Sequence, residues 1–244
     1  MPLIICEGGV LRTKLASEPA AASFTLDLAA WDALAPCGQF ALGAMHELLF
    51  DPNRHRPPKF PALVLAKSAI ARRPGSTLIW CDPDGTLYPP AIAAAGVPLE
   101  RVLIIRPKPP DLNWTIAECL RCKGAGAVVA PMPAKLSRVE ARRFQLAAER
   151  GGGAGVLLRS LGRGSDIYAA ATRWLIQPAC GERTVQRWKV ELVHGHGGHV
   201  GQPVLLEKRR ATDYDCFNEQ HAMEGVVVRT ISTAERAALR RAIG

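Results

Sequence analysis

Residues 77 to 160 alternate between short apolar runs and helical patterns of roughly 10 to 15 residues. The apolar runs are "TLIWC", "RVLIIRP", "AGAVVAPM" and "AGVLLRS", and such unbroken runs are typical of strands that are covered on both faces. The helical patterns include "DLNWTIAECLRCKG" and "SRVEARRFQLAAERGG", in which Ser137 and Glu140 have the spacing of a capping box. This order predicts an α/β fold with a doubly wound, mostly parallel sheet.

The segments on either side of this core extend the prediction. Upstream, the pattern predicts a short amphipathic helix over 24–36, a strand over 43–50, a loop over 51–61 and a helix over 62–73. After Asp166 the strands "AAATRWLIQPA", "RWKVELVHG" and "QPVLLEKR" follow one another without helices. They indicate an antiparallel extension on one side of the sheet.

One domain is expected over residues 1–208, with a loosely structured segment over about 1–25. A chain of 244 residues with 48% hydrophobic residues is long enough to bury one large core. A C-terminal tail, 209–244, follows with "EGVVVRT" and a short helix at its end. The strand-like part of the tail could add to the sheet of its own domain or to that of a partner.

The composition favours a cytoplasmic protein. Seven cysteines without a framework spacing and a start without a charged n-region indicate a reduced protein that carries no signal peptide. No apolar run approaches the roughly 20 residues that span a bilayer, so no membrane contact is expected. A formal charge of +9 favours acidic partners such as nucleic acid, but the basic residues are scattered.

The chain carries five short segments in this order: "HELL", "IWCDPDGTLYPP", "LRCKGAGAVV", "RRFQLAAERGG" and "VLLR". Together they resemble the ImuA family of RecA-like accessory proteins of damage-induced mutagenesis. The resemblance runs from about Leu26 to Lys208. It implies a RecA-like fold in which 41–50 leads into the phosphate loop and "GAGAVVAPMPA" carries the Walker B position.

The phosphate loop of this chain is degenerate. The matching stretch "FDPNRHRPPKFPAL" has no glycine, its Lys59 is followed by Phe60 and Pro61, and its prolines remove amide donors that a phosphate needs. Pro131 stands where the Walker B aspartate should follow its strand. We therefore expect no nucleotide cofactor, no metal and no catalytic residue.

The stretch "CDPDGTL" offers an enzymatic alternative. Asp82 and Asp84 have the pattern of the nucleophile loop of haloacid-dehalogenase-type phosphatases. Such an enzyme needs further carboxylates at a later strand end to hold magnesium, and none has the required place. Asp82 is expected instead to cap its turn by accepting backbone N–H bonds.

Cys119 and Cys122 form a C-x-x-C motif inside a predicted helix. A redox pair would need its first cysteine at a helix N-terminus, where the thiolate is stabilised. Packing of two small side chains on one helix face is the favoured interpretation.

The stretch "HGHGGH" brings His194, His196 and His199 together between two predicted strands. Three imidazoles could bind a divalent metal, but the glycines favour a hairpin turn.

A helix and its ends carry a run of basic residues. They are Lys135, Arg138, Arg142, Arg143 and Arg150. A solvated face is the usual meaning of such a run, and contact with DNA stays open. Trp174 and Trp188 are expected in the core or facing a partner.

The family resemblance implies a non-catalytic protein of SOS-induced translesion DNA synthesis. Its implied partners are an ImuB-like polymerase homologue and an error-prone replicative-type polymerase. Two alternatives are a SulA-like division inhibitor that binds FtsZ and the phosphatase that uses Asp82 and Asp84.

Overall fold

The computed structural model describes two strands near the N-terminus and most of the remaining chain. The described residues are 3–7, 10–14, 22–132, 136–162, 170–180, 185–195, 197–209 and 226–231. The first two stretches, β1 (Leu3–Glu7) and β2 (Val10–Lys14), pair antiparallel. Sequence analysis missed this pair, although two apolar runs separated by Gly-Gly are a hairpin signal.

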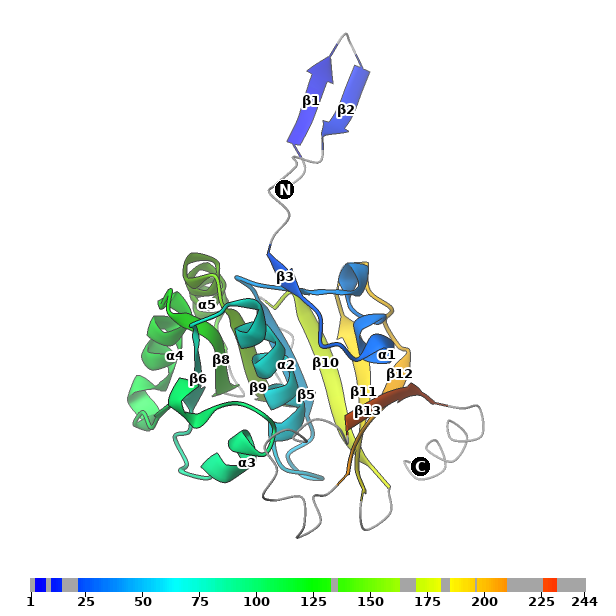
Figure 1. The fold of residues 1–244 in the computed structure, drawn as a ribbon. Coiled ribbons are helices and arrows are strands. Elements are labelled where there is room, and N and C mark those ends of the chain that lie inside the picture. Colours follow the sequence, from blue (N-terminus) through cyan, green and yellow to red (C-terminus); the bar gives the residue numbers. More distant parts are fainter. Residues whose placement is uncertain are drawn as a thin grey trace.

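A nine-stranded sheet has the order β13-β12-β11-β10-β5-β9-β8-β6-β7 (Figure 1). From β10 to β7, each strand runs parallel to the next one in this order, whereas β10 pairs antiparallel with β11. The parallel strands are β5 (Met45–Phe50), β6 (Thr77–Cys81), β7 (Val102–Ile105), β8 (Ala125–Met132), β9 (Ala154–Ser160) and β10 (Thr172–Ala179). The antiparallel strands are β11 (Val185–His194), β12 (Pro203–Arg209) and β13 (Val226–Thr230). The segment "AAATRWLIQPA", predicted in the antiparallel extension, thus belongs to the parallel part, because it pairs with β5. The predicted fold class is confirmed: the chain has a RecA-like, mostly parallel sheet with an antiparallel extension.

Helices cover both faces of the parallel part of the sheet. α2 (Lys59–Arg72) packs on one face, and α4 (Leu112–Arg121) and α5 (Arg138–Gly151) pack on the other (Figure 1). The short helix α3 (Pro89–Ala93) lies between β6 and β7 along the chain. The sheet has one hydrophobic core on each face. Residues of one strand point alternately to the two faces, so the apolar runs of β6, β8 and β9 contribute to both cores.

Residues 22 to 41 form a short α-helical turn and a 3-10 turn (Pro36–Gly38) between two short strands, where sequence analysis predicted a helix over 24–36. The elements are β3 (Ser23–Phe24), α1 (Ala29–Asp32) and β4 (Phe40–Ala41). The Asp32 carboxylate accepts hydrogen bonds from the amides of Leu26 (2.8 Å) and Leu28 (3.1 Å). The residues before Asp32 therefore turn around its side chain instead of continuing a helix.

This N-terminal segment packs its aromatic residues on β10. Trp31 and Phe40 are fully buried, and their ring centroids lie 5.9 and 5.5 Å from that of Trp174. Trp174 is thus a core residue, which is one of the two positions that the sequence analysis expected for it. Trp188 is half-buried and stacks on Phe60 at 5.2 Å between ring centroids.

α2 begins at Lys59, within the predicted loop 51–61. Pro61 lies in its first turn, where the missing N–H of a proline has no intrahelical partner to lose. The prolines of this stretch therefore start the helix early rather than delay it.

The "EGVVVRT" segment contributes the edge strand β13, which pairs with β12 of its own domain. Ile231 directly after it is buried. The short helix predicted at the end of the tail, within 232–244, lies outside the described residues. Among the residues described, no helix has the length and apolar character needed to cross a bilayer.

Candidate functional site

Ligands of open α/β sheets bind at the carboxyl ends of the parallel strands, so the loop after β5 is the first candidate site. This loop, 51–58, folds around its own first residue. The carboxylate of Asp51 accepts a hydrogen bond from the amide of Asn53 (2.9 Å), and its carbonyl accepts from the amides of Arg54 (3.2 Å) and His55 (3.0 Å). These amides point to Asp51, whereas a phosphate loop directs its amides to the ligand.

The N-terminus of α2 is equally short of donors. Pro58 and Pro61 carry no N–H, and the amide of Lys59 donates to the carbonyl of Pro57 at 2.8 Å. The sequence predicted a degenerate phosphate loop, and the hydrogen bonds of 51–61 agree with that prediction.

Lys59, at the position expected for the phosphate-binding lysine, contacts the turn after β6. Its ammonium donates to the carbonyl oxygen and to the hydroxyl Oγ1 of Thr86, both at 2.8 Å. The side chain therefore ties α2 to the "DPDGT" turn.

Asp82 organises that turn and is only 4% exposed. Its carboxylate accepts hydrogen bonds from the amides of Thr86 (3.0 Å) and Leu87 (3.1 and 3.2 Å), while Arg106 Nε lies 3.8 Å away. The predicted turn cap is confirmed. Asp84 is exposed to solvent. A phosphatase would need the Asp82 oxygens free to attack phosphorus, and here they bind backbone amides.

Pro131, at the Walker B position, is half-buried in β8 opposite Leu158 of β9. A proline supplies no carboxylate to a metal or its water shell. Across the described part of the chain, no group of three His, Cys, Asp or Glu residues is placed to hold a metal ion.

The described part of "HGHGGH" packs as a turn between β11 and β12. The amide of His199 donates to the carbonyl of Leu34 at 2.9 Å. A Cβ at Gly198 would come within 2.8 Å of that same carbonyl oxygen, so the close approach requires glycine. The favoured turn interpretation agrees with these contacts, and His196 lies outside the described residues.

The cysteines of the C-x-x-C motif separate. Cys119 is buried in α4, whereas Cys122 is exposed just beyond the helix end, so the expected packing of both on one helix face is wrong. The helix stops at Arg121, and this turns Cys122 away from the core. Cys119 instead contacts Cys81 of β6; a hydrogen bond with Cys119, together with burial, raises the pKa of the Cys81 thiol. The buried Cys81 thiol is therefore a poor nucleophile.

The basic run of α5 lies on its exposed side. The capping box is confirmed, because Ser137 accepts from the amide of Glu140 and the Glu140 carboxylate accepts from the amide of Ser137 at 3.0 Å. Arg138, Arg142 and Arg143 are exposed, as a solvated face predicts. Lys135 lies outside the described residues.

Sequence analysis missed a buried ion cluster. Glu47 of β5 bonds Arg159 of β9 (3.2 Å) and Arg173 of β10 (2.8 Å), and each of these side chains is at most 10% exposed. The cluster lies under the α4 and α5 face, because Glu47 alternates with Leu48 and Phe50 of the opposite core. No sequence motif marks it, since the partners lie more than a hundred residues apart.

Comparison with known proteins found no matching family profile. Two curated proteins, each named Protein ImuA and from two strains of Caulobacter vibrioides, are 28% identical to this chain over 195 residues. The alignments cover 71% of this chain and 79% of each curated protein. These matches support membership of the ImuA family. This similarity agrees with the motif resemblance and with the RecA-like sheet.

Proposed function

We propose that the protein is a non-catalytic accessory factor of damage-induced translesion DNA synthesis and mutagenesis. It acts by binding an ImuB-like polymerase homologue, in an assembly that also contains an error-prone replicative-type polymerase. The ImuA relationship supports the process, and the proposal includes a cytoplasmic location.

One observation carries the non-catalytic part of the proposal. The groups that a RecA-like ATPase directs to its nucleotide are bonded within the protein, with the loop amides on Asp51 and the Lys59 ammonium on Thr86. A triphosphate would have to replace these hydrogen bonds without the glycines that let the backbone approach it. We therefore propose that the loops at the carboxyl ends of the parallel strands are structural. The function of the protein then lies in its contacts with other proteins.

Lys59→Ala should leave the biological activity intact. In cells that lack the chromosomal gene, the wild-type gene should restore the frequency of mutations after DNA damage, and Lys59→Ala should restore it equally. The substitution removes two exposed hydrogen bonds to Thr86, a loss of about 1 kcal/mol or less. Mutation frequency is measured by counting resistant colonies after ultraviolet exposure.

Two controls separate this result from weak catalysis. Calorimetric titration with millimolar ATP and magnesium should give no binding heat, and p-nitrophenyl phosphate should not be hydrolysed. Failure of the wild-type gene to restore mutagenesis would overturn the proposed process. A micromolar dissociation constant for ATP would overturn its nucleotide-independent mechanism.

A further inference from the structure

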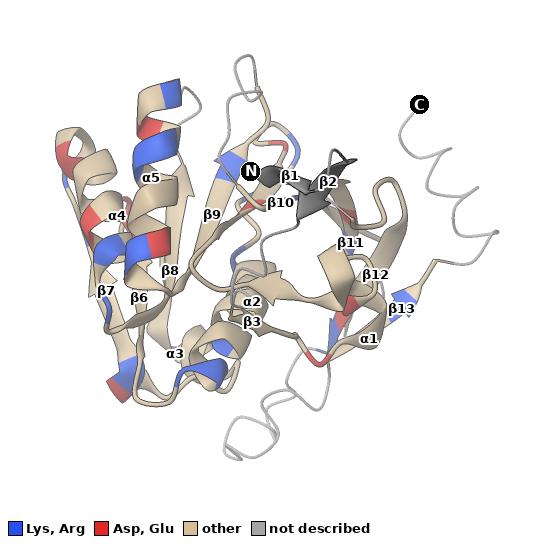
Figure 2. Cartoon of the chain, turned by 90° about the horizontal axis from the view of Figure 1, so that it is seen from above, with Lys and Arg blue, Asp and Glu red and all other residues tan. Residues whose placement is uncertain are grey.

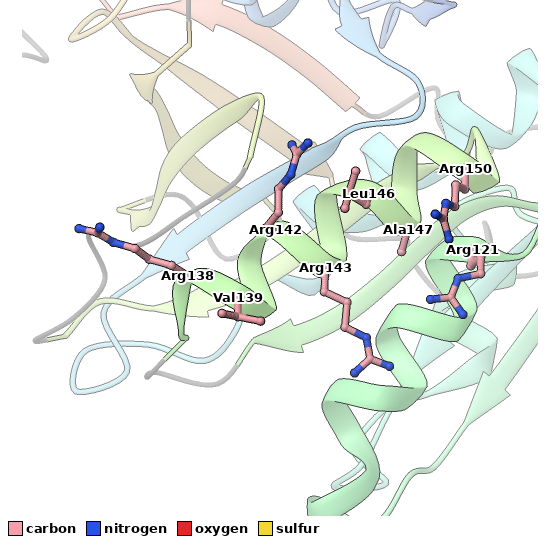
Figure 3. Close-up of a pocket in the computed structure, with 8 residues that line it drawn as sticks. All are labelled: Arg121, Arg138, Val139, Arg142, Arg143, Leu146, Ala147 and Arg150. Atoms are coloured by element: carbon pink, nitrogen blue, oxygen red, sulfur yellow. The ribbon is translucent and has the colours of Figure 1, made fainter.

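A shallow groove of ≈ 560 Å³ follows the outer side of α4 and α5 (Figure 3). Five arginines line it: Arg121 from α4 and Arg138, Arg142, Arg143 and Arg150 from α5. Arg121, Arg143 and Arg150 extend into the space between the two helices. Figure 2 shows basic positions along the length of α5. We call this surface the arginine groove.

The four arginines of α5 form no salt bridge within the part of the chain that the structure describes. Arg121 of α4 pairs with Glu118 of its own helix at 2.6 Å. The acids of α5 hydrogen-bond to other residues, although Glu140 also attracts Arg143. Glu140 accepts hydrogen bonds from Ser137 and from Asn113, and Glu149 accepts from Gln145. The arginine groove therefore presents positive charge that an acidic ligand could neutralise.

The floor of the arginine groove is apolar. Val139 is 79% exposed and Leu146 is 37% exposed, and Ala147 lies beside them. Val139 and Leu146 are seven residues apart, so they lie on one stripe of α5, with Arg143 and Arg150 on the same side. An apolar centre with arginines around it has the composition of a protein interface.

This combination favours a protein over a nucleic acid as the occupant. A phosphodiester backbone would pair with the arginines but leave Val139 and Leu146 without an apolar partner. The lining residues include no aromatic side chain on which bases could stack. An amphipathic helix with aliphatic residues on one stripe and carboxylates on its flanks matches both features.

We infer that the arginine groove is the docking surface for an acidic amphipathic helix of a partner protein. This inference rests on the proposed function in one respect only: both assume that the protein binds another protein. The 14 residues of α5 span about 21 Å at about 1.5 Å per residue, so the docked segment has about 14 residues. Its aliphatic side chains contact Val139 and Leu146, and its carboxylates pair with Arg143 and Arg150.

The test uses a fluorescein-labelled designed peptide of about 14 residues with a leucine stripe at helical spacing and glutamate elsewhere. A scrambled peptide of identical composition lacks the stripe. In fluorescence anisotropy, the striped peptide should bind the full-length protein at least about tenfold tighter than the scrambled one. The double variant Arg143→Glu/Arg150→Glu should weaken binding by more than about tenfold, and Val139→Asp by about tenfold.

Arg72→Glu is the matched control, because Arg72 is exposed on α2, on the opposite face of the sheet. It changes the charge by two units, as each of the two substitutions in the double variant does, and should leave the affinity unchanged. Circular dichroism melting of each variant verifies folding, and Arg143→Ala/Arg150→Ala provides a milder second variant. Equal binding of striped and scrambled peptides, or affinity independent of the arginines, overturns the inference.

A short DNA duplex distinguishes the other ligand class. Tighter binding of the duplex than of the striped peptide, lost in Arg143→Glu/Arg150→Glu, would identify a phosphate surface and overturn the inference. The assay contains no polymerase-like protein, so its failure leaves the proposed function standing. Conversely, if the striped peptide binds as expected, the inference stands even if the ImuB-like partner does not bind.

Discussion

Glu47→Ala is expected to lower the free energy of unfolding by about 3–5 kcal/mol, because it leaves two buried guanidinium groups without their shared carboxylate. Arg159 is fully buried and Arg173 is 9% exposed, so bulk solvent does not reach these guanidinium groups. The three side chains connect the neighbouring strands β9, β5 and β10 at the centre of the sheet. Urea denaturation followed by tryptophan fluorescence measures the loss.

Glu149→Ala is the control, because Glu149 is exposed on α5. Its effect should stay within about 0.5 kcal/mol. Glu47→Gln keeps the shape of the side chain and should cost less than Glu47→Ala. A loss below about 1 kcal/mol for Glu47→Ala would show that the cluster does not hold the central strands together.

Acidification should destabilise the protein through His46, which lies 0% exposed on β5. Burial lowers the pKa of His46 from 6.5 to about 4, against the smaller effect of the Ala41 carbonyl, which raises it. The unfolded chain then binds a proton below about pH 6.5, whereas the folded protein does not until about pH 4. The stability contributed by neutral His46 is complete above pH 6.5 and falls between these values, by up to about 3 kcal/mol.

The measurement is urea denaturation across this pH range for the wild type and His46→Gln. His46 contacts the Thr172 hydroxyl at 2.8 Å and the Ala41 carbonyl at 2.9 Å, and glutamine keeps polar atoms in the site without titrating. His46→Gln should be less stable at neutral pH but should lose less stability on acidification. His199→Gln, at an exposed position, is the matched control for the substitution itself. Equal slopes for wild type and His46→Gln would contradict this account.

Elements whose signals are local could be predicted from the sequence. The strands 125–132 and 154–160 agree with β8 and β9 because their apolar runs are unbroken and are bounded by glycine, proline or polar residues. The helix of the basic run agrees with α5 because Ser137 and Glu140 cap its start, and Gly152 adopts φ 71° at its end. The degenerate phosphate loop could be predicted because proline lacks an N–H in any fold.

Features that depend on strand order could not be predicted. Glu47 and Arg173 are directly paired across β5 and β10, although 126 residues separate them. The hydrophobic periodicity of the sequence does not indicate that β5 lies between β9 and β10. The ion cluster could therefore not be predicted. The error at Asp32 has a different cause. A helical pattern assigns this side chain to solvent, but in the structure its carboxylate accepts hydrogen bonds from the amides of a local turn.

The most direct test of the central claim is co-expression with the ImuB-like polymerase homologue of the same cell, followed by affinity purification and size-exclusion chromatography. The account predicts that the two proteins elute as one complex in the absence of ATP, and that Lys59→Ala elutes in the same way. Separate elution, or a complex that forms only with ATP and is lost in Lys59→Ala, would contradict a nucleotide-independent binding role.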